Sequence, residues 1–298
     1  MKITLVYNPQ AGGASIPVED LITGLEKRGA EVLAQNTKEE DYEQTLKRDC
    51  DFMIIAGGDG TIGKIAGKVM ALGKNIPFAL LPYGNANNIA GSLDVDTALG
   101  TIVDSWHKKD FRDFTVGSID LGGSAWKFFE SVGWGLFAEV LQEVKEEKKS
   151  VSQPSPVRKD KVRYGLQKLS VMVQELQPAF YQVFLDEVDH SGYYLWVEVM
   201  NTQSMGPQLQ LAPDAKHGDR YLDVVLIKEN DRGRLEAFLN SQNGESWGNT
   251  FDPIKARHIK IRSQQPIHID DQLHQMDNPG DQWTEIRLLS EPIKILNA

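Results

Sequence analysis

One stretch decides how this chain of 298 residues folds: Ile54-Ile55-Ala56-Gly57-Gly58-Asp59-Gly60-Thr61. The apolar run that begins at Phe52 predicts a buried strand. Apolar residues at helical spacing follow the turn and predict a helix: Ile62, Ile65, Ala66, Val69 and Leu72. Glycine lacks a Cβ, so the backbone amides of such a turn approach an anion closely, and the helix N-terminus adds partial positive charge. Asp59 suits an anion site when a cation accompanies the anion, as Mg²⁺ accompanies a phosphate chain.

The same letters also suit an ordinary glycine-rich turn, in which Asp59 would be a helix N-cap. No Gly-Lys-Ser or Gly-Lys-Thr follows, so the pattern is not a P-loop, and its spacing is not GxGxxG. The interpretation as a phosphate site therefore depends on other stretches.

Further polar turns follow other expected strands. The strands and the residues after them are Lys2–Tyr7 with Asn8 to Gly13, Glu31–Ala34 with Thr37, and Pro77–Leu81 with Pro82 to Asn88. Helices are expected between them at Val18–Arg28, Tyr42–Arg48 and Ile89–Leu93. This alternation continues to about residue 110 and predicts a doubly wound parallel sheet. Ligands of such sheets bind beyond the carboxyl ends of the strands, so we expect the turns at Asn8, Gly57 and Asn85 to share one edge.

From about residue 114, strands follow one another with Gly, Asp and Asn turns between them. They are Phe114–Leu121, Ala125–Val132, Ala179–Leu185, Tyr193–Met200, Tyr221–Ile227, Ala256–Ile261 and Pro266–Asp270. This series predicts a mainly antiparallel β-sandwich or open barrel, interrupted by one helix at Arg163–Glu175. We expect a nucleotide-binding α/β domain at 1–118 and a β-rich domain at 119–285. We expect the tail, about 286–298, to pack back on the first domain.

Composition excludes some classes of protein. The chain is 41% hydrophobic and 25% charged, which is typical of a globular protein with a core. Its net charge of −10 argues against a nucleic-acid partner, since such proteins are usually basic. The single cysteine, Cys50, allows no internal disulfide and fits a reducing compartment. The chain has no run of 18 apolar residues, the length that predicts a membrane-spanning helix. We therefore expect a cytoplasmic protein.

Residues 145–163 (KEEKKSVSQPSPVRKDKVR) hold seven basic and three acidic residues. One interpretation is a solvated surface loop. The other is a basic patch that contacts an anionic membrane peripherally, where each Lys or Arg contributes about 1 kcal/mol.

Together the motifs resemble the diacylglycerol-kinase-type lipid kinase family, of the bacterial type, which also includes sphingosine and ceramide kinases. The similar segments are Asn8-Pro9-x-Ala11-Gly12, the GGDGT of Gly57 to Thr61, Leu81 to Asn88, Phe128 to Val140, Ala212 to Ala215 with Asp219 to Asp223, and Ile269 to Gln272. They run in the family's order from residue 3 to about residue 275. GGDGT is shared with NAD kinases, but the later segments favour the lipid-kinase branch.

The resemblance implies ATP as cofactor with Mg²⁺, and phosphate transfer to a lipid hydroxyl, diacylglycerol-like or sphingoid-like, at a membrane surface. We also allow for a homodimer. The implied nucleotide contacts are Asn8, Pro9, Thr37, Gly57, Gly58, Asp59, Gly60, Thr61, Gly63, Asn85 and Asn88. The implied metal site combines Asp219 with the carbonyl groups of Lys216 and Tyr221. The family's catalytic acid falls on Gln272. Asp59 and Asp270 are further catalytic candidates, since on a strand Asp270 would share a face with Gln272.

Several positions depart from the family's pattern. They are Lys64 for Glu, Asn85 for Thr, Asn88 for Asp, Arg220 for Gly, Asp271 for Gly and Gln272 for Glu. A glutamine cannot accept a proton as a general base. One alternative is therefore a nucleotide- or lipid-binding protein with weak or lost kinase activity. A second alternative is an NAD-kinase-like enzyme.

Overall fold

The computed structural model describes residues 1–13, 16–150, 161–241, 250–274 and 282–297. The chain forms two compact units, Met1–Thr115 with Glu291–Ala298, and Val116–Ser290. The sequence places this division at residue 118 and the start of the returning tail at about residue 286.

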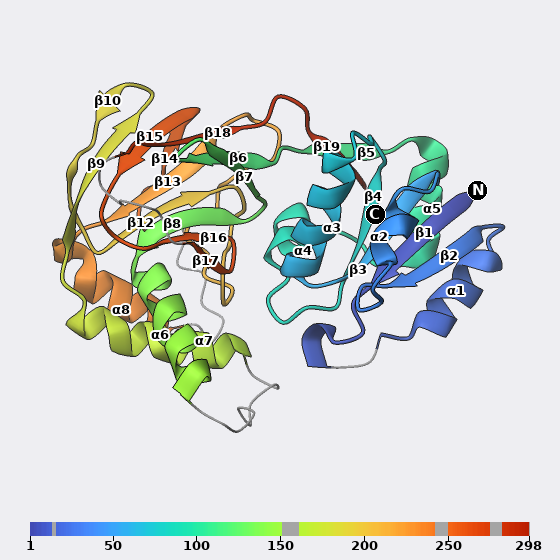
Figure 1. Cartoon of the computed structure of the whole chain (residues 1–298), viewed down its shortest axis with the longest axis horizontal. Helices are drawn as coiled ribbons and strands as arrows, with labels where there is room; N and C mark the ends of the chain where they lie inside the picture. The colour runs from blue at the N-terminus through green and yellow to red at the C-terminus, as the bar shows by residue number, and fades with distance from the viewer. Residues whose placement is uncertain (14–15, 151–160, 242–249, 275–281, 298) are drawn as a thin grey trace. The chain divides into compact units, whose positions relative to one another are not determined.

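The first unit is an α/β domain (Figure 1). Its elements are β1 (Lys2–Tyr7), the 3₁₀ turn η1 (Ala11–Gly13), α1 (Val18–Glu26), β2 (Glu31–Asn36), α2 (Tyr42–Leu46), β3 (Phe52–Gly57), α3 (Asp59–Ala71), β4 (Phe78–Pro82), α4 (Asn88–Leu93), α5 (Leu99–Lys108), β5 (Phe111–Phe114) and β19 (Ile293–Leu296). The strand order is β2-β1-β3-β4-β19-β5. The neighbours from β2 to β19 run parallel, and β5 pairs with β19 antiparallel. The prediction of a doubly wound, mostly parallel sheet is confirmed.

Alternation along the strands explains how helices cover this sheet. In β3, Phe52 and Ile54 pack in one cluster with Leu25 of α1 and Ile102 of α5. Successive strand residues point to opposite faces, so Ile55, which is fully buried, faces the other layer. Helix α3 packs against β3 and buries Ile62, Ile65, Ala66 and Val69. Both faces of the sheet are therefore covered, as a parallel sheet requires.

The second unit is a β-sandwich with added helices. Its elements are β6 (Gly117–Leu121), β7 (Ser124–Phe128), β8 (Ser131–Gly135), α6 (Leu136–Ser150), α7 (Lys161–Glu175), β9 (Ala179–Leu185), β10 (Val188–Asp189), β11 (Gly192–Tyr194), β12 (Trp196–Met200), β13 (Leu222–Ile227), η2 (Glu229–Asp231), α8 (Arg232–Asn240), β14 (Ile254–Ala256), β15 (His258–Arg262), β16 (Ile267–Ile269), β17 (Gln272–His274) and β18 (Thr284–Leu288). One sheet has the order β10-β9-β15-β18-β6-β7, with β11 also on β9, and the other has the order β14-β13-β12-β8-β16-β17. The strands pair antiparallel, so the predicted sandwich is confirmed.

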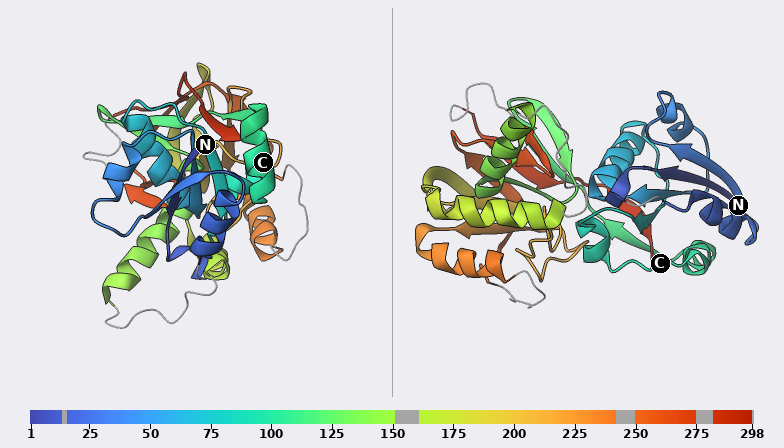
Figure 2. Two further views of the ribbon diagram at one scale, coloured as in Figure 1. Left: turned by 90° about the vertical axis from the view of Figure 1, so that its right-hand side faces the viewer. Right: turned by 90° about the horizontal axis from the view of Figure 1, so that it is seen from below.

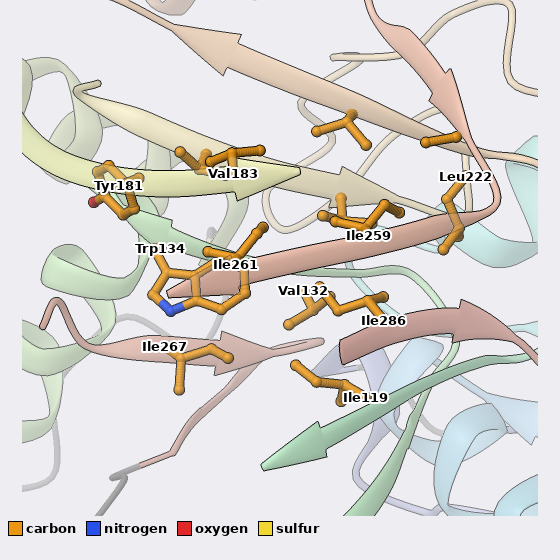
Figure 3. Packing of buried hydrophobic residues seen from close by; sticks show 14 of the residues in the cluster. Ile119, Val132, Trp134, Tyr181, Val183, Leu222, Ile259, Ile261, Ile267 and Ile286 are labelled. Atoms are coloured by element: carbon orange, nitrogen blue, oxygen red, sulfur yellow. The ribbon is translucent and has the colours of Figure 1, made fainter. Parts of the chain in front are cut away.

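The sandwich core lies between the two sheets (Figure 3). Branched aliphatic side chains from one sheet, such as Val183 and Ile261, meet Val132 and Trp134 from the other. The alternate positions of the second sheet point outward, where α6, α7 and α8 cover them. Figure 2 shows α7 and α8 side by side along this layer. Across the described ranges, no helix is long and apolar enough to span a bilayer.

Two segments that are predicted as single strands are divided in the structure, so these predictions are wrong. Phe114–Leu121 breaks after β5, and β6 then joins a different sheet. Ala125–Val132 breaks between β7 and β8, again in different sheets. The second break has a visible cause, because the carboxylate of Asp270 binds the amides of residues 129–131.

The prediction of one helix in the second domain is also wrong, because α6 and α8 accompany α7. Helix α6 begins with a short apolar face, Leu136, Phe137 and Val140, and continues into a charged run that resembles a loop. The segment 145–163 is therefore helical at both ends. Its middle, 151–160, lies outside the described residues.

Candidate functional site

The polar turns of the first unit lie together at the carboxyl edge of its parallel sheet. Strand register places Tyr7 beside Asn36 on one side and beside Ala56 on the other. Backbone hydrogen bonds connect the turns, with Thr37 N–H donating to Tyr7 O at 2.9 Å and Asn8 N–H donating to Ala56 O at 3.0 Å. Asn8 Nδ2 also donates to Thr61 Oγ1 at 3.2 Å. The expectation that these turns share one edge is confirmed.

Glycine is required where the Gly58 turn meets the turn after β4. A Cβ at Gly58 would lie 2.8 Å from the Cα of Gly84, and one at Gly84 would collide with the Cα of Gly58. Tyr83 N–H donates to Gly57 O at 2.9 Å at the same junction. Two backbones therefore run in van der Waals contact, which glycine at both positions allows, and this junction lies beside the N-terminus of α3, where the helix carries partial positive charge.

Asp59 is the first residue of α3 and connects that helix to the next turn. Its Oδ1 accepts the backbone N–H of Ile89 in the first turn of α4 at 2.9 Å. Burial raises the pKa of the Asp59 carboxyl, and hydrogen bonds from the backbone of Ile89, Asn88 and Asn87 act against that rise. The carboxylate thus fixes α4 against α3, which is a structural role, and it remains the acidic group of the glycine turn.

The predicted nucleotide-contact residues differ in how far they are exposed to solvent. Pro9, Gly60 and Asn85 are exposed, and Asn8, Gly58, Asp59, Thr61 and Gly63 are half-buried. Gly57 is buried at the end of β3, and the side chains of Thr37 and Asn88 are buried at 8% and 4% exposure. Those two side chains support the turns from inside, whereas the others present an accessible surface. Lys64 is exposed on α3, with its ammonium 4.7 Å from the centre of the Tyr42 ring.

Asn87 shapes this site and was not singled out in the sequence. Its Oδ1 accepts Gly84 N–H at 2.8 Å, and its Nδ2 donates to Gly84 O at 3.1 Å. Its φ of 55° lies in the left-handed region, which asparagine tolerates better than most residues. The run of three asparagines within Asn85 to Asn88 was the available signal.

In the second unit, Asp270 does not lie on a strand. It forms the turn between β16 and β17 with a φ of 50°, so the expectation that it shares a strand face with Gln272 is wrong. Its Oδ1 accepts the N–H groups of Glu130 at 2.8 Å, Phe129 at 3.0 Å and Ser131 at 3.3 Å. Burial raises the pKa of Asp270 to about 7 against these three hydrogen bonds. Gln272 is exposed at the start of β17.

Next to this turn lies a buried pair that the sequence did not reveal. Glu198 Oε2 is 3.0 Å from His268 Nε2, and Trp196 Nε1 donates to the same oxygen at 2.7 Å. His268 Nδ1 lies 2.8 Å from the carbonyl oxygen of Asp270. A carbonyl oxygen only accepts hydrogen bonds, so Nδ1 carries a proton. The pKa of His268 is raised, because the charge and hydrogen bond of Glu198 outweigh burial, which alone would lower it.

The implied metal site is built differently from the family pattern. Lys255 Nζ lies 2.8 Å from Asp219 Oδ2, and Tyr221 N–H donates to Asp219 Oδ1 at 3.0 Å. Both carboxylate oxygens of Asp219 thus have a partner in the protein, and one of these partners is a cation. This ammonium group would repel a Mg²⁺ ion bound by Asp219, so the arrangement does not fit the implied metal site.

Comparison with known proteins agrees with this architecture. Residues 2–119 match the family model of the diacylglycerol kinase catalytic domain, and residues 139–277 match the YegS C-terminal NAD kinase beta sandwich-like domain. A diacylglycerol kinase of Staphylococcus haemolyticus is 24% identical over 282 residues, 89% of this chain and 80% of the relative. One of Staphylococcus carnosus is 21% identical over 285 residues, 90% of this chain and 88% of the relative.

The same fold occurs in the crystal structure of a diacylglycerol kinase from Bacillus anthracis. The TM-score is 0.71 at 18% identity, over 100% of this chain and 97% of the other. The two family models cover most of the chain, one in each structural unit. The chain belongs to the diacylglycerol kinase catalytic domain family and carries the C-terminal domain of the YegS type.

Proposed function

We propose that this protein is an ATP-dependent lipid kinase that transfers the γ-phosphate to a lipid hydroxyl, either diacylglycerol-like or sphingoid-like. Kinases of this family use ATP. The observation that carries the proposal is the contact of the Gly58 and Gly84 backbones beside the N-terminus of α3. A turn without Cβ atoms at a helix N-terminus suits a phosphate chain.

Phosphoryl transfer needs chiefly positioning and neutralisation of charge. In this proposal, the turn from Gly57 to Thr61 and the turn at Asn85 hold the nucleotide. Asn8 supports the first of these turns through its hydrogen bond to Thr61. Mg²⁺ bound with ATP supplies positive charge at the phosphates, and Asp59 is the carboxylate of the turn that favours a cation there.

The group that would accept the proton of the lipid hydroxyl is the weaker part of the proposed mechanism. Gln272 cannot accept a proton as a base does. The Asp270 carboxylate is held by three backbone amides, which fixes its position and limits its access to a substrate. These two observations favour a second candidate, a nucleotide- or lipid-binding protein with weak or lost kinase activity.

Initial rates distinguish these functions. Phosphate transfer from ATP and Mg²⁺ is measured over diacylglycerol and sphingoid bases in mixed micelles, with NAD as the control acceptor. Transfer to a lipid supports the proposal. Calorimetric binding of ATP without transfer to any acceptor supports the second candidate. Transfer to NAD but to no lipid overturns both and makes the protein an NAD-kinase-like enzyme.

A lipid substrate requires contact with a membrane, so we propose a cytoplasmic protein that binds membranes peripherally. The support is the basic excess of residues 145–163. Sedimentation with vesicles tests it, with neutral and 30% anionic lipid compared at two salt concentrations. Binding that requires anionic lipid and weakens with salt supports the role of this segment. Light scattering on the same preparation tests the homodimer.

A further inference from the structure

The loop before β13 is held by a lysine from the neighbouring strand. β13 and β14 pair antiparallel, and their register places Asp223 opposite Lys255. Lys255 reaches back to Asp219, four residues before Asp223, so its ammonium group connects a carboxylate of the loop with one of β13. Asp223 is nearly buried, Asp219 is partly buried, and the side chain of Lys255 is 40% exposed.

The oxygens around this ammonium are placed as hydrogen-bond acceptors. Lys255 Nζ is 2.8 Å from Asp219 Oδ2 and 3.4 Å from both oxygens of Asp223. An ammonium group has three donors and no acceptor, so it satisfies several carboxylate oxygens from one point. The remaining oxygen of Asp219 accepts the backbone N–H of Tyr221 at 3.0 Å.

Mg²⁺ has stricter needs than an ammonium group. It binds six ligands at about 2.0–2.1 Å in an octahedron, whereas the Asp219 oxygens are turned to an amide and to Lys255. A divalent cation here would also meet the positive charge of the Lys255 ammonium group, which lies 2.8 Å from Asp219 Oδ2. Among the described residues, no three His, Cys, Asp or Glu side chains gather where they could hold a metal.

The backbone of the loop adds a second indication. Arg220 has a φ of 64°, a region that glycine adopts freely and that costs other residues energy. Such a conformation persists only where its surroundings hold it. The residues on both sides of Arg220 supply that support, because Asp219 bonds to Lys255 and its other oxygen closes the turn with Tyr221.

We propose that the Lys255 ammonium takes the place of the implied metal ion, so that the Asp219 loop is closed by a cation of the protein itself and needs no Mg²⁺. The second unit would then be a metal-independent form of its domain. This inference goes beyond the proposed function and does not depend on it, because it concerns how the loop is held and not whether phosphate is transferred.

Thermal unfolding and calorimetry of the full chain without nucleotide test the proposal. Wild type should keep the same Tm in EDTA and in millimolar Mg²⁺, and Mg²⁺ should show no saturable binding heat. Lys255→Met keeps the apolar stem and removes the charge, which leaves the buried Asp223 carboxylate without its partner. We expect its Tm in EDTA to fall by about 4–8 °C and Mg²⁺ to restore a substantial part of the loss.

Matched variants test whether these effects are specific to the Asp219 loop. Lys260→Met removes a lysine of β15 that pairs with Glu187 at 3.6 Å, and it should leave both the Tm and the Mg²⁺ response unchanged. Lys255→Arg should keep the wild-type independence of Mg²⁺. In Lys255→Met with Asp219→Asn, the recovery by Mg²⁺ should disappear.

Two results overturn the proposal. One is saturable Mg²⁺ binding by wild type that Asp219→Asn abolishes, and this result is available even if Lys255→Met does not fold. The other is a folded Lys255→Met that is neither destabilised in EDTA nor stabilised by Mg²⁺.

Discussion

Glu198 and His268 meet across a glycine, with 3.0 Å between Oε2 and Nε2, in the interior of the second unit. The register of β12, β8 and β16 places both residues beside Gly133, where a Cβ would collide with the Glu198 carboxylate. Both side chains are fully buried. The pair ties β16, and with it the Asp270 turn, to the middle of the sheet.

We predict that Glu198→Ala destabilises the protein by about 3–5 kcal/mol, the usual effect of removing one partner of a buried ion pair. It leaves His268 Nε2 and the indole N–H of Trp196 without their acceptor. Urea unfolding followed by tryptophan fluorescence measures the change. Glu285→Ala is the control, since Glu285 pairs with His258 at 3.5 Å in an exposed position, and it should cost less than about 1 kcal/mol. Equal losses of unfolding free energy in the two variants would contradict the prediction that the buried pair stabilises the protein.

Stability should also depend on pH through His268. Its folded pKa is raised above the ordinary value of 6.5, so the folded state binds the proton more tightly than the unfolded state. The stabilisation is complete below pH 6.5 and is lost as pH rises through the folded pKa. We predict that the difference in unfolding free energy between wild type and His268→Gln shrinks as pH rises from 6.5 through the folded pKa of His268. Urea titrations from pH 5.5 to pH 9 measure it, and a difference independent of pH would rule out the effect.

Much of the first domain is predictable because its information is local. The apolar strand from Phe52, the glycine turn and the helical spacing after Thr61 fall within one continuous stretch. Parallel topology then brings the turns to one edge. The break between β5 and β6 has no such local explanation, because the pairing of the two parts of Phe114–Leu121 with different distant strands divides it.

The second domain's polar contacts could not be predicted, because they depend on strand register. Glu198 and His268 are 70 residues apart in the chain, and Lys255 meets Asp219 only because β14 lies against β13. A glutamate in the apolar strand Trp196–Met200 was the one local signal of a buried polar pair. The apolar residues before Asp270 predict that it lies on a strand, but its positive φ places it in a turn.

For the glycine turn, we predict that Gly58→Val abolishes ATP binding while the second unit stays folded. The new side chain would displace the Gly84 turn, since even its Cβ lies 2.8 Å from that backbone. Calorimetric titration with ATP measures binding, and circular dichroism checks the fold. Gly91→Ala is the control, because a Cβ there meets nothing within 4 Å. Wild-type affinity in a folded Gly58→Val protein would refute the phosphate-binding role of the turn.

Asp59→Asn separates the charge of Asp59 from its hydrogen bond. Asparagine keeps an oxygen that can accept the N–H of Ile89, so the Tm should change little. Loss of the carboxylate should weaken Mg-ATP binding or turnover by at least about tenfold, which equals about 1.4 kcal/mol. Asp59→Ala, which removes charge and acceptor together, should lower both the affinity and the Tm. Unchanged affinity and rate in Asp59→Asn would leave Asp59 only its structural role at α4.

The last prediction concerns the missing acid at Gln272. A positioned general base is worth about 10²–10⁴-fold in rate, so a kinase with glutamine at this position should be slow. Gln272 is exposed at the start of β17, where a carboxylate can be introduced without burying charge. We therefore expect Gln272→Glu to raise the initial rate on a lipid alcohol at saturating ATP and Mg²⁺. Asp271→Asn, in the same exposed turn, is the matched control and should leave the rate unchanged.

A second variant, Asp270→Asn, is needed to interpret the result for Gln272→Glu. If its carboxylate only holds the amides of residues 129–131, Asp270→Asn should lower the Tm and the rate together. If it is also the proton acceptor, the rate should fall far more than the stability loss explains, and the acidic limb of the pH–rate profile near pH 7 should disappear, since burial raises the pKa of Asp270 to about 7. Should Gln272→Glu and Asp270→Asn both leave the rate unchanged, the turn between β16 and β17 is structural, and the proton leaves through Asp59 or water.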